Sequence, residues 1–152
     1  MASKFYITGI RRGLGKALHD FYSPDVVRNM RECDTFINCK YNGWEQIDQL
    51  TKAVHLGKRV ISIGSFASDW VYNPNSMWNN YAIHKKALRD ASNQFFDHKQ
   101  DTCVVNFGYI DTESQSGHDK PKMSVEYAVE VIDWIVRQPH RVKEITVVPN
   151  GT

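Results

Sequence analysis

Short apolar runs alternate along this chain with stretches in which apolar residues recur every three to five positions. The runs predict strands at 4–8, 34–38, 59–64, 102–107 and 144–149. The periodic stretches and their capping residues predict helices at 13–22, 23–33, 43–57, 79–98 and 124–138. Strands that alternate with helices are typical of crossover connections between parallel strands. The pattern therefore predicts an α/β fold in which helices flank a parallel sheet.

Two of these helices are predicted from residues at their ends. Ser23, Pro24 and Asp25 suit the N-cap and first turn of a helix, and Gly57 suits its C-terminal end. A parallel sheet binds its ligands beyond the carboxyl ends of its strands. Functional residues are therefore expected in the loops that follow the strands, at 9–15, 39–43, 65–78 and 108–122.

Composition and charge argue against some classes of protein. The 152 residues suit a single domain, 1–152, and 19 Lys and Arg against 17 Asp and Glu give a net charge of +2. This balance, without a long basic run, argues against a nucleic-acid-binding protein. No apolar run is long enough for a membrane span. Cys33, Cys39 and Cys103 are odd in number and widely spaced, so we expect reduced thiols in a cytoplasmic protein.

The first strand is followed by a glycine-rich turn, "TGIRRGLG", at 8–15. The spacing of Gly9, Gly13 and Gly15 permits a tight turn and close approach of a diphosphate to the N-terminus of a helix. The alternative is an ordinary strand-to-helix turn. Arg12 suits a ribose phosphate, although a solvated arginine is an equal alternative.

The helix at 79–98 carries Tyr81 and Lys85, which lie on one face because they are four residues apart. A nearby ammonium would lower the pKa of a tyrosine and make its hydroxyl a usable acid or base. Such a pair is also common in surface helices. Ser65, which closes the third strand, favours the catalytic interpretation because a serine there can hydrogen-bond a substrate oxygen. Lys86 is expected to point to solvent.

These motifs, in this order, resemble those of the short-chain dehydrogenase/reductase family. The turn matches TGxxxGxG, Ser65 closes a middle strand, and Tyr81 and Lys85 match YxxxK. "DTFINCKYN" is similar to the family's Asn-Asn-Ala-Gly strand end, and "VNFGYIDT" to its Pro-Gly-x-Val-x-Thr stretch, with Phe107 in place of the proline. The resemblance extends over nearly the whole chain and implies a Rossmann-like sheet of about five strands, truncated relative to the family.

The resemblance also implies a role for each matched residue. Tyr81 would be the acid/base, Ser65 would orient the carbonyl, Lys85 would bind the nicotinamide ribose, and Asn42 would be the fourth catalytic residue. The implied reaction is hydride transfer between NAD(P)H and a small carbonyl or alcohol substrate. The matched cofactor-binding residues are Thr8, Gly9, Arg11, Arg12, Gly13, Leu14, Gly15, Asn38, Lys85, Gly108, Ile110 and Thr112.

The chain departs from the family between Gly15 and Asn38, which are only 23 positions apart. Family members usually fit two further strand–helix units there, and these bind the adenosine. They also carry the acidic residue that selects NAD. Its absence, together with Arg12, slightly favours NADP over NAD. A shortened adenosine side leaves an alternative open, in which the chain is a catalytically inactive scaffold or regulatory oligomer.

Other sequence features give further expectations. Trp70, Tyr72 and Trp78 either wall the substrate site or serve packing or an oligomer contact. No metal site is expected, because the six histidines lack metal-ligand spacing. A hydrolase is not favoured, because "GSFAS" lacks the final glycine of a nucleophile elbow. A homodimer or homotetramer is expected, because the helices at 79–98 and 124–138 carry more apolar residues than one inward face needs: Leu88, Phe95, Phe96, Trp134 and Ile135.

Overall fold

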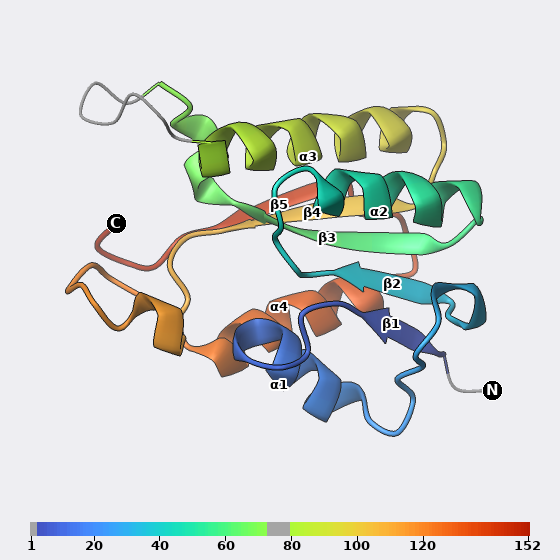
Figure 1. Cartoon of the computed structure of the whole chain (residues 1–152), viewed down its shortest axis with the longest axis horizontal. Coiled ribbons are helices and arrows are strands. Elements are labelled where there is room, and N and C mark those ends of the chain that lie inside the picture. Colours follow the sequence, from blue (N-terminus) through green and yellow to red (C-terminus); the bar gives the residue numbers. More distant parts are fainter. Residues whose placement is uncertain (1–2, 73–79) are drawn as a thin grey trace.

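The computed structural model describes residues 3–72 and 80–152, and it contains five strands and four α-helices (Figure 1). The strands are β1 (Phe5–Ile7), β2 (Thr35–Asn38), β3 (Arg59–Ser65), β4 (Thr102–Phe107) and β5 (Glu144–Val147). The helices are α1 (Gly13–Tyr22), α2 (Glu45–His55), α3 (Asn80–Asp97) and α4 (Val125–Val136). The predicted strands and four of the five predicted helices are therefore confirmed, with ends that differ by a few residues.

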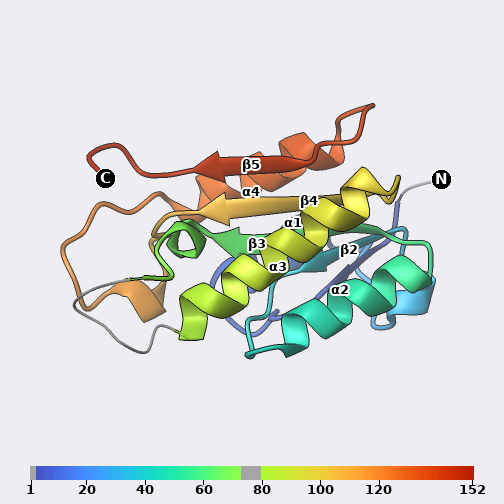
Figure 2. The ribbon, with the colours of Figure 1, turned by 90° about the horizontal axis from the view of Figure 1, so that it is seen from above.

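All strand pairs are parallel, and the sheet order is β1-β2-β3-β4-β5. Helices α2 and α3 cover one face of the sheet, and α1 and α4 cover the other (Figures 1 and 2). Each face has its own buried core: Leu18 and Ile132 belong to the core under α1 and α4, and Leu50 and Leu88 to the core under α2 and α3. The predicted α/β fold, in which helices flank a parallel sheet, is therefore confirmed.

The predicted helix at 23–33 is wrong. The peptide Ser23–Pro24 is cis, and Val26 makes a parallel bridge to Phe5 at the outer edge of β1. The Phe5 N–H donates to Asp25 O at 2.9 Å, and the Val27 N–H donates to Phe5 O at 2.8 Å. Val26 packs against the core under α1 and α4, whereas Val27 packs against the core under α2 and α3. Residues 25–27 are thus extended, because they hydrogen-bond the edge of β1 and pack against both cores.

Most of the apolar residues that were expected at a partner surface pack inside this chain instead. Leu88 and Ile135 are fully buried inside this chain, and Phe95 packs against the core under α2 and α3. Phe96 lies under the guanidinium of Arg141, with 4.3 Å between the ring centroid and Cζ. Of the five, Trp134 alone is strongly exposed. No helix within the described ranges is long and apolar enough to cross a membrane.

Candidate active site

The carboxyl end of β3 and the start of α3 bring three predicted residues together. Ser65 is the last residue of β3, and Tyr81 and Lys85 lie on the first two turns of α3. Ser65 hydrogen-bonds the Tyr81 hydroxyl, and the Nζ of Lys85 lies 5.6 Å from the centroid of the Tyr81 ring. Tyr81 is partly exposed, whereas Lys85 is almost fully buried. The arrangement joins a solvent-accessible phenol to a buried ammonium.

Lys85 is held by two protein oxygen atoms. Its ammonium donates to Gln46 Oε1 at 2.9 Å and to Ile63 O at 2.8 Å. The ring of Tyr41 lies 5.4 Å from the ammonium and packs edge-on against Tyr81. An ammonium has three N–H groups, so these two bonds leave one for a ligand hydroxyl. Tyr41 therefore sets part of the access to Lys85.

Lys86 follows the prediction that it points away from this site. Its side chain is half exposed and pairs with Asp90, one turn along α3. Tyr41 and His84 also lie at the outer side of the cluster, joined by a hydrogen bond of 2.7 Å between Tyr41 Oη and His84 Nδ1. Because α3 has this orientation, Lys85 alone of the two lysines is placed for chemistry at Tyr81.

The expected lowering of the Tyr81 pKa is not found. Burial raises the pKa of Tyr81 above its usual value, and the hydrogen bond from Ser65 opposes this. Burial also lowers the pKa of Lys85 to about 8, and the charge interaction with Cys39 opposes this. The tyrosine is therefore protonated near neutral pH, and the lysine is mostly charged.

Gln46 is a site residue that the sequence prediction missed. Its Nε2 donates to Asn38 O at 2.8 Å and to Ile63 O at 3.0 Å, while its Oε1 accepts from Lys85. Asn38 donates from its amide to Gln46 O at 2.8 Å. Gln46 thus links the end of β2 to the end of β3 and to α3, and this network fixes the ammonium.

Asn42, the predicted fourth catalytic residue, is exposed, and its amide donates to Glu45 at 2.5 Å. The structure therefore does not bring Asn42 to Lys85. A signal for Gln46 exists in the sequence, because it occupies the first position of a helical stripe whose other buried members are Leu50, Ala53 and Val54. A polar residue on such a stripe needs buried partners.

The glycine-rich turn has the conformation that its spacing predicts. Gly9 and Gly13 have φ angles of +74° and +60°, which favour glycine. A Cβ on Gly15 would lie 2.0 Å from Gly9 O, so the start of α1 packs directly on the turn. Arg12 occupies the N-cap position without a side-chain cap, and the first turn of α1 has no acidic residue. The positive end of α1 is therefore available to an anion.

The remaining predicted cofactor residues surround this turn in different ways. Thr8 Oγ1 accepts from the backbone N–H groups of Cys39 and Lys40, at 3.0 and 3.1 Å, and so joins the loops after β1 and β2. A Cβ on Gly13 would lie 3.6 Å from the methyl group of Thr112, which places the loop after β4 beside the turn. Arg11 is exposed, and Leu14 is buried in the core as an anchor of α1.

The other residues of the loop after β4 are structural neighbours of β5 and of the core. The Gly108 N–H donates to Val147 O at 2.9 Å, and a Cβ on Gly108 would lie 2.7 Å from Pro149. Ile110 bridges Met123 and packs against the core under α1 and α4. The aromatic residues predicted near the substrate, Trp70 and Tyr72, are strongly exposed, and Trp78 lies outside the described residues.

A cleft of about 670 Å³ extends from the glycine-rich turn toward the edge of β1. Gly9 and Asn38 line it on the side of the sheet, and Arg28 and Lys40 bring positive charge. Arg28 directly follows the extended segment at 25–27 that covers β1. The chain thus has a cleft on the side where its shortened sequence suggested that the adenosine-binding part is missing.

No known family profile matches the sequence, and no curated protein matches it. Solved structures do match. A 4-hydroxyisoleucine dehydrogenase in complex with NADH has a TM-score of 0.77 at 12% identity, with 99% of each chain covered. A short-chain dehydrogenase from Burkholderia cenocepacia in complex with NADP has a TM-score of 0.67 at 18% identity, with 95% of this chain and 87% of the other covered.

A third match is the 3-alpha-hydroxysteroid dehydrogenase from Pseudomonas sp. in complex with NADH. Its TM-score is 0.70 at 13% identity, and 96% of this chain and 95% of that chain are covered. At these identities the likeness is one of fold. The chain has the Rossmann-like fold of the short-chain dehydrogenases over nearly its whole length.

Proposed function

We propose that this chain is an NAD(P)-dependent oxidoreductase that reduces a small carbonyl substrate, with Tyr81 as the proton donor. The observation that carries the proposal is the convergence of Ser65, Tyr81 and Lys85 at the carboxyl end of β3. The dinucleotide fits the glycine-rich turn, because positive φ angles and the close approach of Gly15 to Gly9 expose backbone N–H groups at the start of α1. The cleft beside the turn supplies room for the adenosine.

Each side chain has a distinct part in this reaction. The nicotinamide, when bound, supplies the hydride that adds to the carbonyl carbon. Tyr81 donates its phenolic proton to the carbonyl oxygen, which yields the alcohol, and Tyr81 regains a proton from solvent. Ser65 hydrogen-bonds the same oxygen, and Lys85 offers its remaining N–H to a ribose hydroxyl. The pKa of Tyr81 is raised above its usual value by burial, so the phenol is protonated at neutral pH and can act as the acid of a reduction.

The charges of the cleft support NADP over NAD. Arg28 and Lys40 line the cleft, and Arg12 is exposed at the adjacent turn. Glu45 is the one acidic residue among those that line the cleft, and it accepts a hydrogen bond from Asn42. Guanidinium groups bind a phosphate through paired charge-assisted hydrogen bonds. The adenosine ribose phosphate of NADP therefore suits this lining better than free ribose hydroxyls.

We expect NADPH to bind more tightly than NADH when each is titrated separately and nicotinamide fluorescence is followed. Arg28→Ala should weaken NADPH binding roughly tenfold, which corresponds to the loss of one charge-assisted contact. NADH binding should change little. Arg137→Ala, on the C-cap of α4, is the control for loss of a surface cation. Equal affinities in wild type would contradict the preference for NADP.

A catalytically inactive scaffold is the second candidate function. The observation that favours it is Tyr41, whose ring packs on Tyr81 and beside the Lys85 ammonium. A scaffold would bind neither NADPH nor NADH in the same titration. An enzyme that must first move Tyr41 aside would bind at least one of them.

We also propose that the chain assembles as a homodimer or homotetramer. Tyr127 and Trp134 are seven residues apart on α4, so they share a face, and each is about half exposed. Sedimentation equilibrium at micromolar concentration should show an oligomer, and Trp134→Glu should shift it toward monomer. Trp70→Glu, which changes an exposed tryptophan elsewhere, is the control. A wild-type monomer would contradict the proposal.

A further inference from the structure

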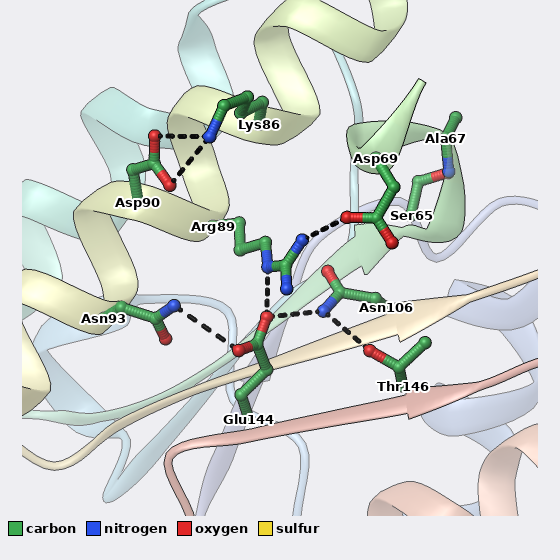
Figure 3. Close-up of polar contacts among 10 residues, drawn as sticks. All are labelled: Ser65, Ala67, Asp69, Lys86, Arg89, Asp90, Asn93, Asn106, Glu144 and Thr146. Carbon is green, nitrogen blue, oxygen red and sulfur yellow. Dashed lines mark hydrogen bonds and ion pairs between the residues drawn. The ribbon is translucent and has the colours of Figure 1, made fainter. Parts of the chain in front are cut away.

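A set of charged contacts joins α3, β5 and the segment that follows Ser65 (Figure 3). Arg89 donates from Nη1 to Asp69 Oδ1 at 2.5 Å and from Nε to Glu144 Oε1. Arg89 and Glu144 are about three-quarters buried, and Asp69 is half exposed. We call Asp69, Arg89 and Glu144 the clamp. Its partial burial separates it from ordinary surface ion pairs, which contribute little.

The clamp is connected to Ser65 through a short 3-10 helix, η2 (Phe66–Asp69). Ser65 is the N-cap of η2, and its Oγ accepts from the Ala67 N–H at 3.1 Å. Asp69 is the last residue of η2. Arg89 therefore fixes one end of a single helical turn whose other end carries the serine.

A second path leads from the clamp back to the same point. Glu144 Oε1 accepts from Asn106 Nδ2 at 2.8 Å, and this orients the amide of Asn106 on β4. Asn106 pairs in register with Gly64, and a Cβ on Gly64 would lie only 2.5 Å from Asn106 Oδ1. The residue before Ser65 is thus packed against a side chain that Glu144 holds. The two paths therefore hold Ser65 on both sides along the chain, through β4 at the residue before it and through η2 at the residues after it.

Helix α3 carries both Tyr81 and one member of the clamp. Tyr81 and Arg89 lie on the same helix, two turns apart, so the position of Arg89 fixes where α3 lies relative to η2. We infer that the clamp positions Ser65 against Tyr81, so that Asp69, Arg89 and Glu144 are positioning residues for the candidate active site. The consequence for turnover rests on the proposed function, but the consequence for the Ser65–Tyr81 hydrogen bond does not.

The test reads the hydrogen bond directly at Tyr81. A 3-fluorotyrosine placed at position 81 is titrated and followed by 19F NMR, because the fluorine lowers the phenol pKa into a convenient range. The groups that face Tyr81 are Ser65 from β3, Tyr41 and Cys39 from the loop after β2, Tyr109 from the loop after β4, and Lys85 from α3. Ser65→Ala removes the hydrogen bond completely and should raise the pKa of residue 81 by roughly one unit, and the other variants are compared with this change.

Asp69→Asn is expected to raise the same pKa, by roughly half a unit or more, because a freed η2 weakens the bond from Ser65. Loss of a negative charge alone would act in the opposite direction, since it favours the phenolate. Asp90→Asn is the matched control, because Asp90 pairs with Lys86 on the exposed side of α3 (Figure 3). It removes the same charge and leaves the clamp intact.

Arg89→Lys provides a second variant that keeps the charge of the clamp. A lysine has no planar fork with which to hold two carboxylates, so this variant should also raise the pKa of residue 81. An unchanged or lowered pKa in both Asp69→Asn and Arg89→Lys would overturn the inference. The titration needs neither cofactor nor substrate, so its result stands apart from whether the chain is an enzyme.

Discussion

Tyr81→Phe should lower carbonyl reduction with NADPH by about 10²- to 10⁴-fold, because the substitution removes the proton donor and little else. The phenol ring packs edge-on against Tyr41, and phenylalanine retains that contact. Ser65 and Lys85 keep their remaining partners, since Ser65 Oγ accepts from Ala67 and Lys85 donates to Gln46. The fold and the binding of the cofactor should therefore survive.

The measurement is steady-state turnover against a panel of small aldehydes and ketones, with NADPH binding followed in parallel by fluorescence. Tyr127→Phe is the control, because Tyr127 is an exposed tyrosine on α4, away from the end of β3. If Tyr81→Phe reduced the same substrates at the wild-type rate, Tyr81 would not be the acid. If the variant lost NADPH binding together with activity, the loss would be one of affinity.

Gln46→Leu should lower the free energy of unfolding by about 3 kcal/mol at pH 5, where Lys85 stays charged, because it leaves a buried ammonium without one of its two acceptors. Leucine fills a similar volume, so the effect reports the lost hydrogen bonds more than a cavity. Asn38 O would lose its donor in the same change. Urea unfolding, followed by circular dichroism, measures the difference. Gln49→Leu, the same substitution three residues later on α2, controls for helix propensity.

The pH dependence of this loss identifies Lys85 as its cause. The pKa of Lys85 is about 8 in the folded chain and 10.5 when unfolded, so the unfolded state binds more protons between these values. Burial of the ammonium therefore costs stability below pH 8, and stability recovers as the pH rises toward 10.5. In Gln46→Leu the folded pKa falls further, so the recovery begins at lower pH. The difference between the two proteins should shrink as the pH rises to 8, and a constant difference would place the effect elsewhere.

The sheet could be predicted from the sequence because parallel strands buried on both faces are nearly continuous apolar runs, as β4 is. The error at 23–33 has a physical cause. Ser23, Pro24 and Asp25 form a good local helix start, but the free edge of β1 is a long-range feature that local patterns do not contain. Pairing with Phe5 and the burial of Val26 outweighed the local preference.

The site was predicted unevenly for a similar reason. The order of Ser65, Tyr81 and Lys85 along the chain was enough to place them together. Gln46 was missed because its role depends on where the ends of β2 and β3 meet, which no spacing in the sequence encodes. The direction of the Tyr81 pKa was missed because burial, not the neighbouring lysine, dominates it. The catalytic role of Asn42 stays a prediction, and so do the cofactor-binding roles of Ile110 and the other matched residues.

The covered edge of β1 has a consequence for how copies of this chain can associate. Residues 25–27 close one side of the sheet, while on the other side β5 pairs, within the described ranges, with β4 alone. Growth of the sheet by strand addition is therefore possible at one end only. Two copies joined through β5 would form one continuous sheet whose two outer ends are the β1 edges covered by residues 25–27, so strand pairing at β5 would recruit no third copy. Because only one edge of the sheet is open, pairing of strand edges permits a dimer and opposes a fibre.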